Sequence, residues 1–211
     1  MPEALWQALE YLKQGGWTMI PLIGFSLLMW MFILERWWSF RRLESSDIKI
    51  TRAVKAMDEG SYKGVREGLR ARLVRDFLER RAGEPDVDRR VLQECTLALR
   101  HSLKDRLAAI AVLASVAPLL GLLGTVLGMI ETFDVISVFG TGNARAMAGG
   151  ISVALVTTQS GLIIAIPGLF ISGALARRAR RLENRLDEVA VILDRHIKLG
   201  GPAPSAEVEA T

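Results

Sequence analysis

The stretch AMAGGISVALVTTQSGLIIAIPGLFISGALA (146–176) contains thirty-one consecutive residues without a charge. A helix of about 20 apolar residues already crosses the hydrocarbon core of a bilayer, so this stretch predicts a transmembrane helix. Its small residues recur in steps of three and four, which places them on one stripe and lets a second helix approach closely. We expect helix packing along this stripe, at Gly150, Ala154, Gly161 and Ala165.

Two further runs without charge lie at 18–34 and 107–130. The chain is therefore predicted to be an all-α integral membrane protein with three transmembrane helices. The second run repeats the small-residue stripe of the third, with packing residues Gly121, Gly124 and Gly128. The first run has no such stripe and lies between Trp17 and Trp37–Trp38, as expected of a lipid-facing helix with interfacial aromatic residues.

Basic residues are distributed unevenly along the chain. Of 27 Lys and Arg, 18 lie at positions 36–106 and 7 lie after position 176. The positive-inside rule then predicts an N-terminus outside the cytoplasm and a C-terminus inside it. A soluble nucleic-acid-binding protein is excluded, because it would not need three uncharged runs of this length.

These patterns divide the chain into eight segments. They are an amphipathic helix on the non-cytoplasmic surface of the membrane (1–17), a first transmembrane helix (18–36), a cytoplasmic helical domain (37–106), a second transmembrane helix (107–136), a non-cytoplasmic loop (137–147), a third transmembrane helix (148–176), a cytoplasmic helix (177–199) and a disordered tail (200–211).

Two of the transmembrane helices are expected to extend into a cytoplasmic helical bundle. A helix capped by Asp86 or Asp88 is predicted to run unbroken to about Phe133, because no glycine or proline intervenes before position 118. The third span continues into apolar residues at heptad-like spacing: Leu182, Leu186, Val189 and Leu193. Within the cytoplasmic domain, Ser61 is predicted to cap a further helix.

Hydroxyl groups are the notable polar groups at membrane depth, at Thr125, Thr157 and Thr158. Such hydroxyls either bond to backbone carbonyls of their own or a neighbouring helix, or they line a pore. The uncharged runs 107–130 and 146–176 contain no Asp, Glu, Lys, Arg or His, the residues that usually form proton relays in membranes. Either the chain conducts nothing, or a partner helix brings a charged group into a cavity lined by these threonines.

Enzymatic and metal chemistry have no support in the sequence. Cys95 is the single cysteine, and His101 and His196 have no ligand partner at helical spacing. No phosphate-binding loop or nucleophile–base pair is present. We therefore expect no enzyme, no cofactor and no metal site.

The segments ASVAPLLGLLGTVLGMIETF (114–133) and GISVALVTTQSGLIIAIPGL (150–169) resemble the two signature spans of the MotA/TolQ/ExbB proton-channel family. The similarity is greatest to its ExbB branch. The resemblance implies a homopentamer of three-span subunits around a central pore in the bacterial inner membrane, with a periplasmic N-terminus. It also implies that Thr125 and Thr158 face the pore.

The same resemblance implies two partners. A single-span, ExbD-like protein would supply the proton-carrying aspartate, and a TonB-like energy transducer would pass the proton-motive force to outer-membrane import. Many relatives have an acidic residue where this chain has Val153. A TolQ-like role in envelope maintenance, another ion-driven stator, and a non-conducting membrane scaffold are the alternatives.

Overall fold

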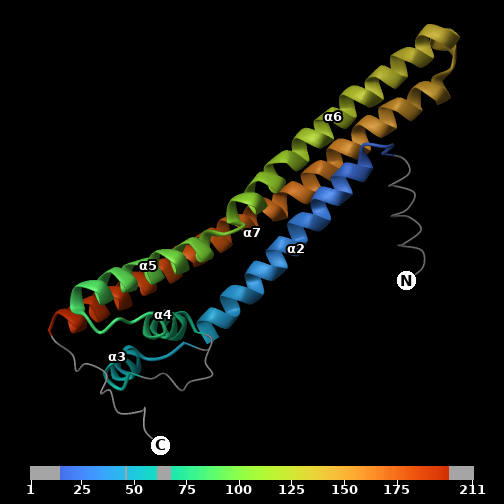
Figure 1. The fold of residues 1–211 in the computed structure, drawn as a ribbon. Coiled ribbons are helices and arrows are strands. Elements are labelled where there is room, and N and C mark those ends of the chain that lie inside the picture. Colours follow the sequence, from blue (N-terminus) through green and yellow to red (C-terminus); the bar gives the residue numbers. More distant parts are fainter. Residues whose placement is uncertain (1–14, 46, 61–67, 200–211) are drawn as a thin grey trace, which may run out of the picture. The chain divides into compact units, whose positions relative to one another are not determined.

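The computed structural model describes residues 15–45, 47–60 and 68–199. The described residues form six α-helices and one short 3₁₀ turn (Figure 1): α2 (Met19–Ser45), α3 (Ile50–Asp58), α4 (Leu69–Leu78), α5 (Pro85–Lys104), α6 (Leu107–Phe139), η1 (Gly140–Gly142) and α7 (Ala144–Lys198). Most of the predicted outer-surface helix, Ser61 and the tail lie outside the described residues. Three helical stretches are long and apolar enough to cross a membrane: Met19–Ser45, Pro85–Gly142 and Ala144–Lys198. The predictions of an all-helical chain and three apolar spans are confirmed.

The chain divides into two compact units. The apolar unit comprises Met1–Leu34 and Arg106–Ala174, and the charged unit comprises Glu35–Asp105 and Leu175–Thr211. Each unit has its own packing and is described separately below.

In the apolar unit, α6 and the first half of α7 lie side by side (Figure 1) and their backbones touch at glycines. A Cβ on Gly161 would lie 2.7 Å from the carbonyl oxygen of Ala117, and one on Gly128 would lie 2.6 Å from that of Gly150. Those distances are far shorter than real Cβ contacts, so only glycine fits there. The helices therefore meet along the two small-residue stripes.

The first span completes the apolar unit. Met19 and Leu22 form a buried cluster with Ala117 and Ala165. The Met29 sulfur packs against Gly168 of α7. A Cβ on Gly168 would lie 2.5 Å from this sulfur, so the contact depends on the glycine. The remaining face of α2 within this unit presents large apolar side chains to the outside, as does Trp17 just before the helix: Ile20, Leu27, Leu28, Trp30, Met31 and Leu34.

In the charged unit, α5 packs along the second half of α7. Buried leucines fill the contact, including Leu92, Leu99 and Leu103 on α5 and Leu182, Leu186 and Leu193 on α7. Ion pairs flank it: Arg89–Asp194 at 2.8 Å, Arg100–Asp187 at 2.5 Å and Lys104–Glu183 at 3.4 Å. Two long helices thus pair within this unit, and their placement in the cytoplasm stays a prediction.

The predicted cap of α5 is wrong. The helix begins at Pro85 with Glu84 as its N-cap residue, and no side chain bonds to its first turn. The Asp88 carboxylate is instead buried and accepts hydrogen bonds from the backbone N–H groups of Ala82 and Gly83 and from Arg81 Nε. Asp88 therefore fixes the loop before the helix, not the helix end.

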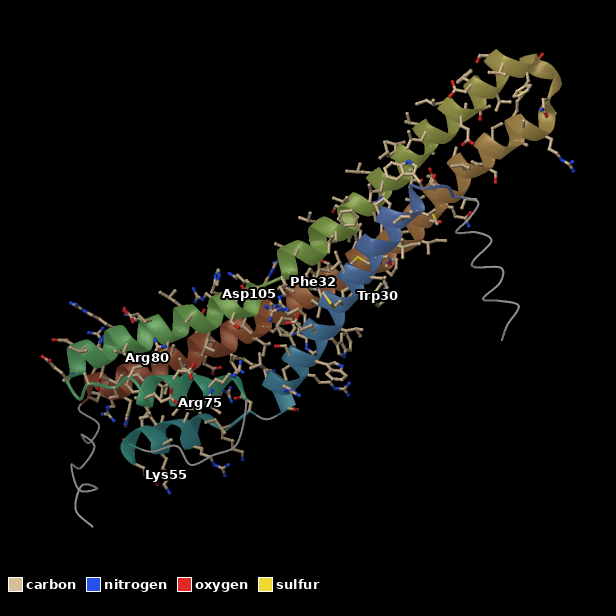
Figure 2. The ribbon with its side chains drawn as sticks, turned by 45° about the vertical axis from the view of Figure 1, so that its right-hand side comes forward. Trp30, Phe32, Lys55, Arg75, Arg80 and Asp105 are labelled. Carbon is tan, nitrogen blue, oxygen red and sulfur yellow. The ribbon has the colours of Figure 1, made fainter. Side chains whose placement is uncertain are left out.

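The predicted unbroken helix to Phe133 is also wrong. Helix α5 ends at Lys104, and Arg106, with φ of 62°, is the single non-glycine residue with positive φ in the described part of the chain. Arg36 from α2 compensates the break near Asp105 (Figure 2): its Nε donates to the Asp105 carbonyl at 2.7 Å and its Nη2 to that of Ser102 at 2.8 Å. These bonds satisfy carbonyls that a helix end leaves without partners.

We expect Gly150→Ala to destabilise the protein, because its Cβ would contact Thr132 and lie 2.6 Å from the Gly128 carbonyl oxygen. Overpacking of this kind costs about 1–3 kcal/mol, or roughly 5 °C in melting temperature. The control is Gly149→Ala, since a Cβ at Gly149 meets nothing within 4 Å. Equal melting temperatures of the two variants in detergent would contradict this packing.

Replacing Arg36 with Gln is expected to lower the melting temperature, because the side chain is only 6% exposed and its two carbonyl partners lose their donors. Leaving buried polar groups unsatisfied costs about 1–3 kcal/mol. Arg41→Gln, at an exposed position of the same helix, is the control and should melt as the unmodified protein does. A melting temperature of Arg36→Gln equal to the control's would show that the carbonyls find other donors.

Candidate functional site

Thr125, Thr157 and Thr158, the candidate pore-lining residues, all lie near the contact of α6 and α7 around Gly121 and Gly124, but their side chains face different surroundings. Thr157 is 1% exposed, because its side chain fills the space beside Gly124 on α6. Its Oγ1 lies 2.9 Å from the carbonyl oxygen of Val153 and 3.0 Å from that of Ala154. In this subunit Thr157 is thus a packing residue whose hydroxyl is satisfied within its own helix.

Thr158, the next residue, connects the two helices. Its half-buried hydroxyl lies 3.2 Å from the carbonyl oxygen of Gly121 on α6 and 3.2 Å from that of Ala154 on α7. A hydroxyl has one proton to donate, so it bonds to one of these carbonyls at a time or shares the proton between them. Its oxygen retains acceptor capacity for water or for a protonated group.

Thr125 follows Gly121 by four residues, one turn along the same face of α6. Its side chain is half-buried, and Oγ1 donates to the Leu122 carbonyl oxygen at 2.6 Å. Thr125 and Thr158 are therefore both next to Gly121, one along α6 and one across from it. Both keep part of their surface open, unlike Thr157.

The surroundings of these hydroxyls are electrically neutral. On α6 the first acidic residues after Thr125 are Glu131 and Asp134, both exposed near the end of the helix. No cluster of His, Cys, Asp or Glu suited to a metal ion is found in residues 15–45, 47–60 and 68–199. A neutral hydroxyl does not titrate near pH 7, so the pair can orient water or a proton donor but cannot itself carry a proton.

One polar residue at this interface was missed by the sequence analysis. Thr132 is 3% exposed, donates to the Gly128 carbonyl oxygen at 2.9 Å, and lies against Gly150. The signal was available, because Thr132 continues the series Gly121, Thr125 and Gly128 at helical spacing.

Val153 lies beside the start of the first span. A Cβ on Gly16 would be 3.6 Å from Val153 Cγ1, an ordinary van der Waals distance. The apolar side chain at this position therefore faces the chain entering α2.

Large apolar side chains cover the exposed faces of α6 and α7 at the level of the threonines, among them Leu119, Leu122, Val126, Leu155 and Leu162. Exposed apolar surface of this extent is typical of contact with lipid or with other membrane helices.

The chain matches known membrane proteins over most of its length. The model of the MotA/TolQ/ExbB proton channel family matches residues 55–188. An ExbB-like biopolymer transport protein of Synechocystis is 35% identical over 164 residues, which cover 74% of this chain and 78% of that protein. ExbB of Aquifex aeolicus is 43% identical over 93 residues (44% and 62%), and TolQ of Haemophilus influenzae is 27% identical over 213 residues (89% and 91%).

The different exposure of the threonines predicts different reactivity of cysteines placed there. In a Cys95→Ala background, Thr157→Cys should react with N-ethylmaleimide roughly tenfold more slowly than Thr125→Cys or Thr158→Cys, because a buried thiol reacts only after local opening. The rates are measured on the detergent-solubilised full chain. Equal rates at positions 157 and 158 would contradict the placement of Thr157 inside the α6–α7 contact.

Proposed function

Because this chain belongs to the MotA/TolQ/ExbB proton channel family, we propose that it is an inner-membrane motor subunit that works with an ExbD-like partner to energise TonB-dependent outer-membrane import. Members of the family are membrane channel proteins, not enzymes, which confirms the sequence-based prediction that this chain has no catalytic role. The resemblance of the two glycine-rich spans to the family is likewise confirmed.

The observation that supports ion conduction is the neutral hydroxyl pair, Thr125 and Thr158. Proton transfer through a membrane needs a titratable group or a chain of water molecules. These two hydroxyls lie next to Gly121, keep part of their surface open, and have no charged residue of their own span beside them. A carboxylate carried by the single-span partner would supply the missing titratable group, and the hydroxyls would hold water or the carboxyl group in place.

The remaining assembly follows from the same proposal. Five copies would surround the partner's helix, with the apolar faces of α6 and α7 covered by neighbouring copies and lipid. The excess of basic residues at 36–106 and after 176 supports cytoplasmic placement of those segments, and leaves the loop between α6 and α7 periplasmic.

A TolQ-like role in envelope maintenance is the second candidate. It is favoured by the match to Haemophilus influenzae TolQ, which extends over 89% of this chain. The two roles share the same ion pathway and differ in the transducer, so they are separated by which single-span and transducer proteins copurify. A scaffold without ion flux is the third reading, in which the stripes serve packing alone.

We expect Thr158→Val to abolish energised uptake and proton flux while the complex still assembles, because valine keeps the shape and removes the hydroxyl. The matched control is Thr157→Val: its hydroxyl is buried and satisfied within α7, so flux should fall by less than about twofold. Flux is measured in liposomes containing this chain and its partner, with complex mass checked in parallel. Normal flux in Thr158→Val would refute the assigned role, and no flux in the unmodified complex would favour the scaffold.

A further inference from the structure

The end of α2 that follows the apolar span has two differently used faces. Arg36, Phe40 and Leu43 are buried there. Glu35, Trp38, Ser39 and Arg42 recur at steps of three and four and share the other face. Within the charged unit, that face and Leu43 border a hollow of about 320 Å³, to which α4 contributes Arg72. Figure 1 shows this end of α2 next to α4.

The lining of the hollow combines two cations with groups suited to the edge of a bilayer. Arg42 and Arg72 come from different helices, and a guanidinium group binds phosphate oxygens through two parallel N–H bonds. Ser39 adds a hydroxyl, and Trp38 is 68% exposed. Tryptophan at the end of a transmembrane helix sits at the level of the lipid headgroups.

We propose that this hollow binds the phosphodiester headgroup of a membrane phospholipid. Arg42 and Arg72 contact the phosphate, Ser39 donates a hydrogen bond to it, and Trp38 lies against the glycerol end of the acyl chains. The site is independent of the ion pathway proposed above.

The charge and the place of the lining suit a phospholipid headgroup. Glu35 is part of the lining, so its carboxylate and the two guanidinium groups sum to one positive charge. A phosphodiester carries one negative charge, which this net positive charge balances. The hollow also lies directly after an apolar span, where headgroups are concentrated.

A lipid in this hollow would contact a helix that is not itself apolar enough to enter the membrane. Helix α4 is only ten residues long and rich in arginine. One headgroup held by Arg72 of α4 and Arg42 of α2 would therefore bind α4 to the membrane surface. Helix α4 is already held at its first turn by Asp47, whose carboxylate accepts a hydrogen bond from the Arg70 backbone N–H at 3.0 Å. The lipid would provide a second attachment.

The test compares arginines inside and outside the hollow on the same two helices. The purified full chain, stripped of copurifying lipid and mixed with dioleoylphosphatidylglycerol in detergent, is analysed by native mass spectrometry. Arg72→Gln and Arg42→Gln should each weaken binding of the tightest lipid about fivefold or more, because each removes one charge near the headgroup. The controls are Arg75→Gln on α4 (Figure 2) and Arg41→Gln on α2, neither of which lines the hollow.

Circular dichroism and melting temperature identify variants that have lost their fold. Arg72→Lys keeps the positive charge but lacks the paired N–H donors of a guanidinium group, so it should bind the lipid with intermediate strength. Equal losses in Arg72→Gln and Arg75→Gln, or no loss in either, would overturn the proposal in favour of general surface charge. Displacement of the bound lipid by millimolar inorganic phosphate would overturn the assignment to a lipid.

Discussion

Contact between the backbones of α6 and α7 at their glycines is the constraint on which the rest of the apolar unit depends. Inside a bilayer, burial of apolar side chains gives little drive for helices to associate, since the lipid is equally apolar. Close packing has to supply that drive, and it is available here because Gly121, Gly128 and Gly161 lack the atoms that would hold the helices apart. This contact fixes the rotation of each helix, and the rotation determines which threonine is buried.

That rotation explains why adjacent residues differ in what they can do. Thr157 and Thr158 are separated by about 100° around α7. The first therefore enters the contact beside Gly124, while the second reaches the Gly121 carbonyl and keeps part of its surface open. Thr125, Thr157 and Thr158 each have a carbonyl partner, so their hydroxyls are satisfied without a charged group. A proton carrier brought in by another chain would meet preformed, neutral hydrogen-bonding groups.

The sequence predicted the features that repeat along the chain and missed those that depend on one distant contact. The glycine spacing of both spans, the heptad-like leucines of α7 and the three apolar runs are periodic, and periodicity survives without tertiary information. The break at Asp105–Arg106 has no local signal, because the donor that satisfies its carbonyls is Arg36, 69 residues away from Asp105. Asp88 was misread for a related reason: cap residues and loop-fixing residues are the same types, and only the fold tells them apart.

Two arginines at the end of the first span have different surroundings, which a count of charges along the sequence does not distinguish. The positive-inside rule treats Arg36 and Arg42 alike, since both follow the span on the same side. Six residues separate them along the helix, which places their side chains about 120° apart, on different faces of α2. Arg36 is buried and bonds to carbonyls at the end of α5, where its removal leaves unsatisfied acceptors. Arg42 is exposed and lines the hollow together with Arg72 of α4. Net charge therefore predicts the side of the membrane, while the position of each arginine around the helix determines whether its side chain is buried in the fold or lines the hollow.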